Sequence, residues 1–154
     1  MSIGGDEKVV TVWGKKAGAD PRNPLSWSSI WSMKDAHPAT INYLTTFKSV
    51  TESDLYFATM CSDGVLKLWA GAAEGDQVTF ALKSELLFGR NLQEVTELLK
   101  FGENDLLLLT GGYDSKIHVY MTELGPGPSE LKYQFSMAGH FNSIKSLSFS
   151  PTLA

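Results

Sequence analysis

The chain has 154 residues, of which 43% are hydrophobic and 19% are charged, so it can bury a core and does not have the composition of a disordered chain. Its net charge is −4, which argues against a surface dedicated to polyanions. The single cysteine, Cys61, excludes an internal disulfide and a cysteine-based metal cluster, so we expect a reducing, intracellular compartment.

Short stretches in which apolar and polar residues alternate follow one another along the chain. They are rich in β-branched and aromatic side chains, which predicts strands with one buried face. Two denser apolar runs, at 55–61 and 106–112, predict inner strands buried on both faces. The predicted strands are 9–13, 25–33, 55–61, 65–69, 106–112, 116–120, 133–140 and 143–151, and the segment 36–47 is predicted to lead into a further inner strand.

The segment 91–101 is ambiguous, because its apolar residues also have the spacing of an amphipathic helix. Its all-strand surroundings favour a strand, and the helix stays as the alternative. Two stretches rich in Pro and Gly, at 14–26 and 123–130, predict surface loops that are too short to separate domains. Turn residues at 62–64, 102–105 and 112–115 punctuate the strands.

One sequence pattern, an aspartate followed six residues later by an aromatic residue, repeats along the chain. Asp63 precedes Trp69 by six residues, and Asp114 precedes Tyr120 by six, with an offset of 51 residues between the two aspartates. Asp6 and Trp13 form a third copy that is one residue longer. A period of about 40 to 50 residues with several short strands in each unit is typical of propeller blades.

A second pattern precedes the inner strands. His37 is followed by an aliphatic residue at the fourth and seventh positions after it, and His140 is followed in the same way. In the middle unit Asn91 stands where a histidine is expected.

These residues resemble the WD40 repeat family across nearly the whole chain. The resemblance implies a β-propeller of four-stranded blades, commonly seven. It also implies a buried structural tetrad in each blade, made of a His, a Ser or Thr, an Asp and a Trp. A buried carboxylate needs hydrogen bonds, and an imidazole N–H can supply one while an indole packs beside it. The tetrad positions in this chain are His37, Thr59, Asp63 and Trp69, then Thr110 and Asp114, and finally His140.

The tetrad of the middle unit departs from the family pattern. Asn91 replaces the His and Tyr120 replaces the Trp, so its network must be altered or absent. That departure weakens the expectation for the tetrad there without weakening the expectation for the fold.

The expected fold is therefore all-β and corresponds to roughly three blades of a larger ring. The expected units are the end of one blade at 1–13, a blade at about 26–69, a blade at about 77–120 and the start of another at about 131–154. Such an arc is expected either to be an excerpt of a longer chain or to share a ring with a second chain. An unclosed arc leaves two exposed sheet edges, which are sites of unwanted pairing.

Within the WD40 family, the order of units is similar to that in the second subunits of Elongator complexes. There a unit without the usual His is followed by one that begins with Gly-His. This likeness implies a non-catalytic scaffold that supports assembly of a complex modifying wobble uridines of tRNA. It implies other Elongator subunits as partners, tRNA only indirectly, and a cytoplasmic location with a nuclear one in addition. Phe141-Asn142-Ser143 departs from the Glu-Asp-Trp usual in that group.

Two other functions stay open. One is an adaptor of another complex that binds a peptide on a propeller rim. The other is an enzyme, since some propellers are hydrolases or lyases. No nucleophile elbow, phosphate loop or zinc spacing occurs in the sequence, so we expect no catalytic residue, cofactor or metal site. No segment has the length or composition of a membrane helix or a signal peptide, so no membrane is expected as a partner.

A few side chains are candidate partner contacts. Trp27 and Trp31 lie four residues apart in the predicted outer strand and either pack between blades or anchor a partner. Lys15, Lys16 and Arg22 make a modest basic loop, which is either a solvated surface or a contact for tRNA phosphate. His118 alternates with apolar neighbours in a predicted strand, and we expect no ligand role for it.

Overall fold

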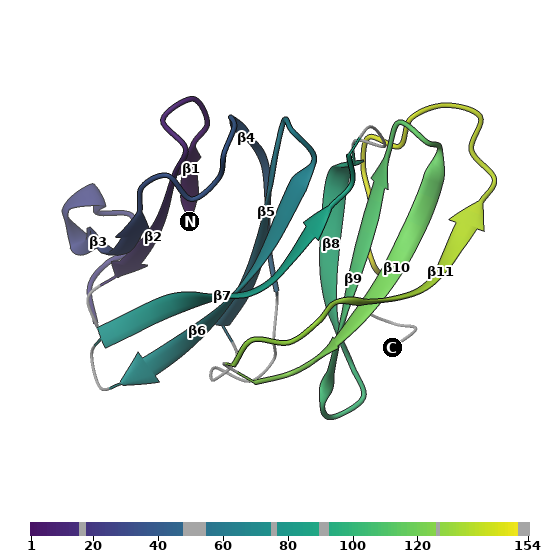
Figure 1. The fold of residues 1–154 in the computed structure, drawn as a ribbon. Coiled ribbons are helices and arrows are strands. Elements are labelled where there is room, and N and C mark those ends of the chain that lie inside the picture. Colours follow the sequence, from purple (N-terminus) through teal and green to yellow (C-terminus); the bar gives the residue numbers. More distant parts are fainter. Residues whose placement is uncertain (16–17, 48–54, 75–76, 90–92, 126, 151–154) are drawn as a thin grey trace.

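The computed structural model describes residues 1–15, 18–47, 55–74, 77–89, 93–125 and 127–150. It confirms the all-β expectation: the described residues form three antiparallel sheets and a single 3-10 turn, η1 (Pro24–Ser26). The three sheets lie side by side in chain order, with sheets 1 and 3 at opposite ends (Figure 1).

The sheets have a simple meander topology, because every neighbouring pair of strands is consecutive in the chain. Sheet 1 has three strands and sheets 2 and 3 have four each. Sheet 1 contains β1 (Ser2–Gly4), β2 (Val9–Lys15) and β3 (Trp27–Met33). Sheet 2 contains β4 (Ile41–Thr46), β5 (Leu55–Cys61), β6 (Val65–Glu74) and β7 (Gln77–Leu87). Sheet 3 contains β8 (Gln93–Phe101), β9 (Asp105–Gly112), β10 (Lys116–Glu123) and β11 (Lys132–Ala138).

The ambiguous segment 91–101 is a strand in its described part, 93–101, where β8 pairs with β9. The prediction of a strand at 143–151 is wrong for its described part, since residues 143–150 are assigned to no strand. Boundaries also differ: the expected unit 26–69 takes β3 from sheet 1 and its other strands from sheet 2. The outer strand of each sheet pairs with the strand that precedes it in the chain. The sequence units instead assigned this strand to the following unit, so each unit begins one strand earlier than the sheet it corresponds to.

The same hairpin turn joins the second and third strands of each full sheet and the first two strands of sheet 1. The turns span 5–8, 61–64 and 112–115, and in each the N–H of the fourth residue donates to the carbonyl of the first. The fourth residue has a left-handed backbone in every case: φ is 57° at Lys8, 74° at Gly64 and 60° at Ser115. Asp63 and Asp114 therefore occupy the same turn position. In the first turn the same position is held by Glu7 and not by Asp6. Glu7 precedes Trp13 by six residues, so the spacing of the first copy equals that of the other two.

These turns allow a direct prediction. Gly64→Ala is expected to lower the free energy of unfolding by about 1–2 kcal/mol, because a Cβ is strained in the left-handed region. Ser115→Gly removes such strain at the equivalent position and is expected to raise it by at most about 1 kcal/mol. Urea unfolding of both variants tests this. Equal losses in the two variants would show that the turns are not equivalent.

Two apolar clusters hold the sheets together. The first lies between sheets 1 and 2, and the second lies between sheets 2 and 3. Members of the first include Val10, Val12, Phe57, Trp69 and Phe80. Members of the second include Ala58, Leu66, Leu68, Leu106 and Leu108. Sheet 2 is thus covered on both faces, which explains the dense apolar run of β5.

A backbone hydrogen bond links two of the lead-in segments, those that follow His37 and His140, to the preceding hairpin. The N–H of Ile41 donates to the carbonyl of Gly5 at 3.1 Å, and the N–H of Ile144 donates to the carbonyl of Gly112 at 3.0 Å. Gly5 and Gly112 are both the first residue of their turn. The predicted equivalence of the His37 and His140 segments is therefore present in the backbone, although the second segment forms no strand.

The Pro/Gly loop that follows β10 joins sheet 3 to sheet 2. Its Gly125 N–H donates to the Tyr56 hydroxyl at 2.6 Å. The ammonium of Lys83, which is only 3% exposed, donates to the carbonyls of Gly125 and Gly127. Through these hydrogen bonds, the described residues of the loop predicted at 123–130 hold sheet 3 against sheet 2. Nothing in the sequence marked Lys83, because a lysine in a strand usually faces solvent.

Candidate functional site

A buried polar network lies between sheets 1 and 2. Thr59 on β5 is its centre: the Trp69 indole N–H donates to the Thr59 hydroxyl oxygen at 2.9 Å. The His37 Nε2 lies 2.7 Å from the same oxygen. All three residues are at most 2% exposed. Three of the four predicted tetrad residues of this unit are therefore brought together.

The local fold explains how they meet. Thr59 and Trp69 come from neighbouring strands, β5 and β6, and His37 lies in the lead-in segment before β4. That segment is tied down by the Lys67 ammonium, which donates to the Ala36 carbonyl at 2.8 Å. Asp63, the fourth predicted member, lies in the exposed hairpin turn and takes no part in the network. The expected carboxylate partner is thus wrong for this unit. His37 Nδ1 has no hydrogen-bond partner among the described residues.

Burial sets the charge state of His37. Desolvation, with a smaller repulsion from the Lys67 ammonium, lowers the pKa of His37 from 6.5 to about 4. The imidazole is therefore neutral at neutral pH. A neutral ring suits a network that supplies no anion to balance a positive charge.

The Thr59 hydroxyl can be tested against an equivalent residue. Thr59→Val is expected to lower the free energy of unfolding by about 2 kcal/mol, because it leaves two buried ring nitrogens without a partner. Thr110 has the same place on β9, is fully buried, and its hydroxyl has no hydrogen-bond partner among the described residues. Thr110→Val is therefore expected to be neutral or stabilising. Chemical denaturation of both variants gives the comparison, and a larger loss from Thr110→Val would contradict it.

Sheet 3 replaces the network with a different one. The His118 Nε2 lies 2.5 Å from a carboxylate oxygen of Asp114, and the Lys116 N–H donates to the other oxygen at 3.2 Å. Burial raises the pKa of Asp114, but hydrogen bonds from His118, Lys116 and Gln93 outweigh it and the net pKa is lowered. The sequence left open whether the network of this unit is altered or absent. An altered network is present, and it includes His118, which was expected only to have no ligand role. Asn91 lies outside the described residues.

Tyr120 takes the place of the tryptophan without a bond to Thr110. Its ring packs edge-on against Phe88 and Tyr133 at 6.2 Å and 5.7 Å between centroids. Burial, followed by nearby negative charge, raises the pKa of Tyr120. The only signal for the His118 contact in the sequence is its spacing of four from Asp114, which is common by chance.

The remaining predicted site residues are dispersed. His140 is exposed, and no tetrad contact forms around it in the described part of the chain. Trp31 packs edge-on against Phe57, Trp69 and Phe80, with centroids 6.3, 6.1 and 5.3 Å away. Trp31 therefore fills the packing role that its sequence position allowed.

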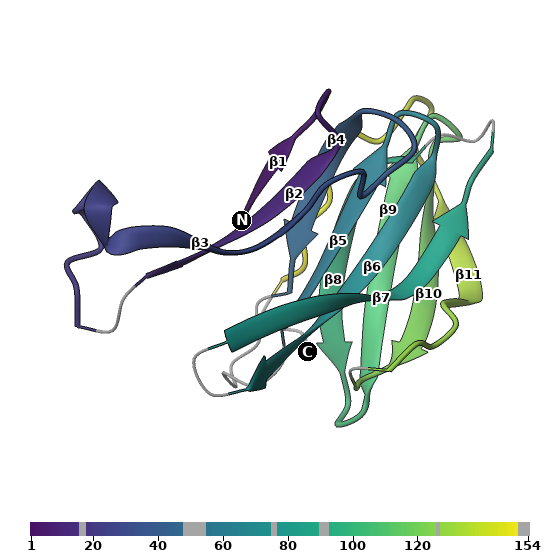
Figure 2. The same ribbon diagram turned by 60° about the vertical axis from the view of Figure 1, so that its left-hand side comes forward.

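The other candidate partner contacts lie on the surface. Trp27 is 43% exposed, and its indole N–H donates to the Pro21 carbonyl at 3.1 Å. Lys15 and Arg22 are exposed beside it, and Lys16 lies outside the described residues. The segment around η1 that carries Trp27 projects from the rest of the molecule (Figure 2).

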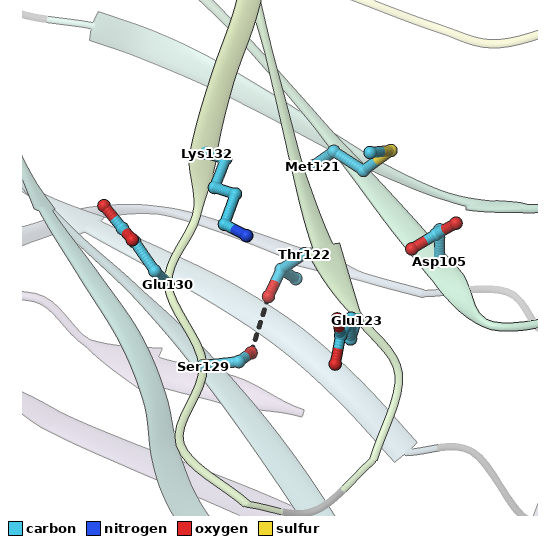
Figure 3. Close-up of a pocket in the computed structure, with 7 residues that line it drawn as sticks. All are labelled: Asp105, Met121, Thr122, Glu123, Ser129, Glu130 and Lys132. Atoms are coloured by element: carbon cyan, nitrogen blue, oxygen red, sulfur yellow. Dashed lines mark hydrogen bonds between the residues drawn. The ribbon is translucent and has the colours of Figure 1, made fainter.

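A pocket of about 320 Å³ lies between the end of β10 and the loop that follows it (Figure 3). The hydroxyls of Thr122 and Ser129 are 2.5 Å apart within it. Its lining residues are Asp105, Met121, Thr122, Glu123, Ser129, Glu130 and Lys132. The pocket shares none of these residues with the His37 network.

Over the described ranges, no group of three or more His, Cys, Asp and Glu residues is arranged to hold a metal ion. No helix in that part of the chain could span a membrane. Cys61 is buried and has a free thiol.

Comparisons with known proteins add no assignment. No protein-family model matches the sequence, and no curated protein matches it.

Proposed function

We propose that the chain is a protein-interaction scaffold of the WD-repeat type. The observation that carries this proposal is the repeated module: matching hairpin turns, and the same hydrogen bond from a lead-in isoleucine to a corner glycine at both ends of the chain. The His37–Thr59–Trp69 network adds side-chain support, because it joins three of the residue types that the repeat requires. Stacked sheets of this kind hold loops rigidly for partner contacts.

The finer proposal is a role like that of the second Elongator subunit, supporting assembly of the complex that modifies wobble uridines of tRNA. Its support is the order of units, with a module that lacks the usual His followed by one that begins Gly139-His140. The exposed Trp27 and the basic side chains near it are the proposed contact region.

Affinity purification followed by mass spectrometry tests the finer proposal. We expect the tagged chain to recover Elongator subunits, and Trp27→Ala to reduce that recovery while leaving the unfolding midpoint unchanged. Trp31→Ala is the matched control, because it should lower stability through lost packing. Recovery of an unrelated assembly would instead favour an adaptor of another complex and would end the Elongator proposal.

A further inference from the structure

The three sheets share a structural landmark that fixes which residues are equivalent. A β-bulge interrupts the pairing of the last two strands after Val12 in sheet 1, after Leu68 in sheet 2 and after Val119 in sheet 3. The residue just after the bulge is Trp13, Trp69 or Tyr120. The residue just before the bulge pairs with a residue on the outer strand of the same sheet. This outer-strand partner is Trp31 in sheet 1, Ser84 in sheet 2 and Phe135 in sheet 3.

In the interface between sheets 1 and 2, these two positions meet. Trp31 of sheet 1 inserts its ring against Trp69 of sheet 2, and the centroids are 6.1 Å apart at 64°. Aromatic pairs prefer such edge-on geometry and bury a large apolar area. In this interface the outer-strand residue of sheet 1 packs its ring against the residue that follows the bulge of sheet 2. The outer-strand position of sheet 2 is Ser84, which carries no ring, so the interface between sheets 2 and 3 does not use this pair.

At the two ends of the molecule the same positions hold exposed aromatic residues. Phe135, the counterpart of Trp31, is 53% exposed, and Met137 beside it on β11 is 42% exposed. Trp13, the counterpart of Trp69, is 46% exposed, and Ile30 on the neighbouring strand is 40% exposed. Sheets 1 and 3, which carry these positions, lie at opposite ends of the row of described sheets (Figure 1). Clustered exposed apolar side chains of this kind mark interaction surfaces.

The charges of the two ends also differ in sign. Residues 93–138, which form sheet 3, carry seven Asp and Glu against three Lys, a net charge of −4. Residues 1–33, which include sheet 1, carry four Lys and Arg against three Asp and Glu, a net charge of +1. Opposite charge favours an encounter between the two ends over an encounter between two like ends.

We infer that two copies of this chain associate head to tail, with Phe135 of one copy packed against Trp13 of the other. The contact continues the interface already present between sheets 1 and 2. It joins two different surfaces, so it is heterologous and builds a ring if the rotation closes or an open chain if it does not. This inference does not depend on which complex the protein serves.

Sedimentation velocity of the full chain tests the inference through two variants. Phe135→Asp and Trp13→Asp each place a charge on one of the two surfaces, and both positions are exposed, so the variants should fold. We expect the unaltered chain to associate as its concentration rises, and each variant alone to stay monomeric. Leu87→Asp is the control, since this residue is 74% exposed on sheet 2, away from both surfaces, and should not change association.

A mixture of the two variants distinguishes the type of interface. Each variant keeps the surface that the other lacks, so an equimolar mixture is expected to form dimers and no larger species. A monomeric unaltered chain at every concentration would overturn the inference. Association of either variant alone, or a mixture that stays monomeric, would also overturn it. Circular dichroism confirms that each variant has kept its fold.

Discussion

Trp69→Ala is expected to lower the free energy of unfolding by about 3–5 kcal/mol, the range for removing a large buried aromatic residue. Trp69 is 2% exposed and stacks on Phe57, with ring centroids 5.8 Å apart at 16°. It also donates the hydrogen bond to Thr59. The variant therefore opens a cavity between sheets 1 and 2 and leaves a buried hydroxyl with one partner fewer. Equilibrium denaturation in urea measures the loss.

The matched control is Trp13, which occupies the equivalent position in sheet 1 but is 46% exposed. Trp13→Ala is expected to cost about 1 kcal/mol or less, because little apolar area leaves the core. The difference between the two losses of unfolding free energy measures how much packing against a neighbouring sheet stabilises this position. Similar losses at the two positions would show that Trp69 is not packed as the structure places it.

Acidification is expected to destabilise the protein through His37. Its pKa is lowered from 6.5 to about 4 in the folded state, so the unfolded chain binds a proton more readily over that interval. Stability therefore falls as the pH drops below about 6.5, by about 2 kcal/mol at pH 5 and about 3 kcal/mol at pH 4 relative to neutral pH, and it levels off below the folded pKa. Unfolding free energies measured at several pH values give this curve.

The contribution of His37 is separated from that of other groups by substitution. His37→Gln removes the titrating ring, so its stability is expected to vary less between pH 7 and pH 5. His140→Gln, at an exposed histidine, is the matched control substitution. An unaltered slope in the His37 variant would contradict the neutral, buried ring.

Local patterns in the sequence were sufficient to predict the all-β class and most of the strands. The alternation of apolar residues predicted the strands at 9–13, 65–69 and 116–120, and β2, β6 and β10 contain them. The segment at 143–150 has the same alternation, yet it forms no strand. A strand needs a paired neighbour as well as a pattern, and sequence periodicity does not report pairing.

The polar networks were harder to predict. The resemblance implied that His37, Thr59 and Trp69 lie together, and their side chains meet in the structure. The register of the hairpin between β5 and β6 accounts for the approach of Thr59 and Trp69. The sequence did not show that Asp63 would face solvent while Asp114, at the same turn position, would accept a bond from His118. The two turns share a backbone path, but the neighbouring side chain on β10 decides which carboxylate turns inward. The periodicity of apolar residues therefore could not predict which of the two aspartates forms a hydrogen bond.

Hydrogen-bond scalar couplings measured by NMR test the equivalence of the modules most directly. We expect a coupling from the Ile41 amide nitrogen to the Gly5 carbonyl carbon, and one from the Ile144 nitrogen to the Gly112 carbonyl carbon. The two couplings should be of similar size. Absence of the Ile144 coupling in a chain that shows the Ile41 coupling would contradict a repeated module.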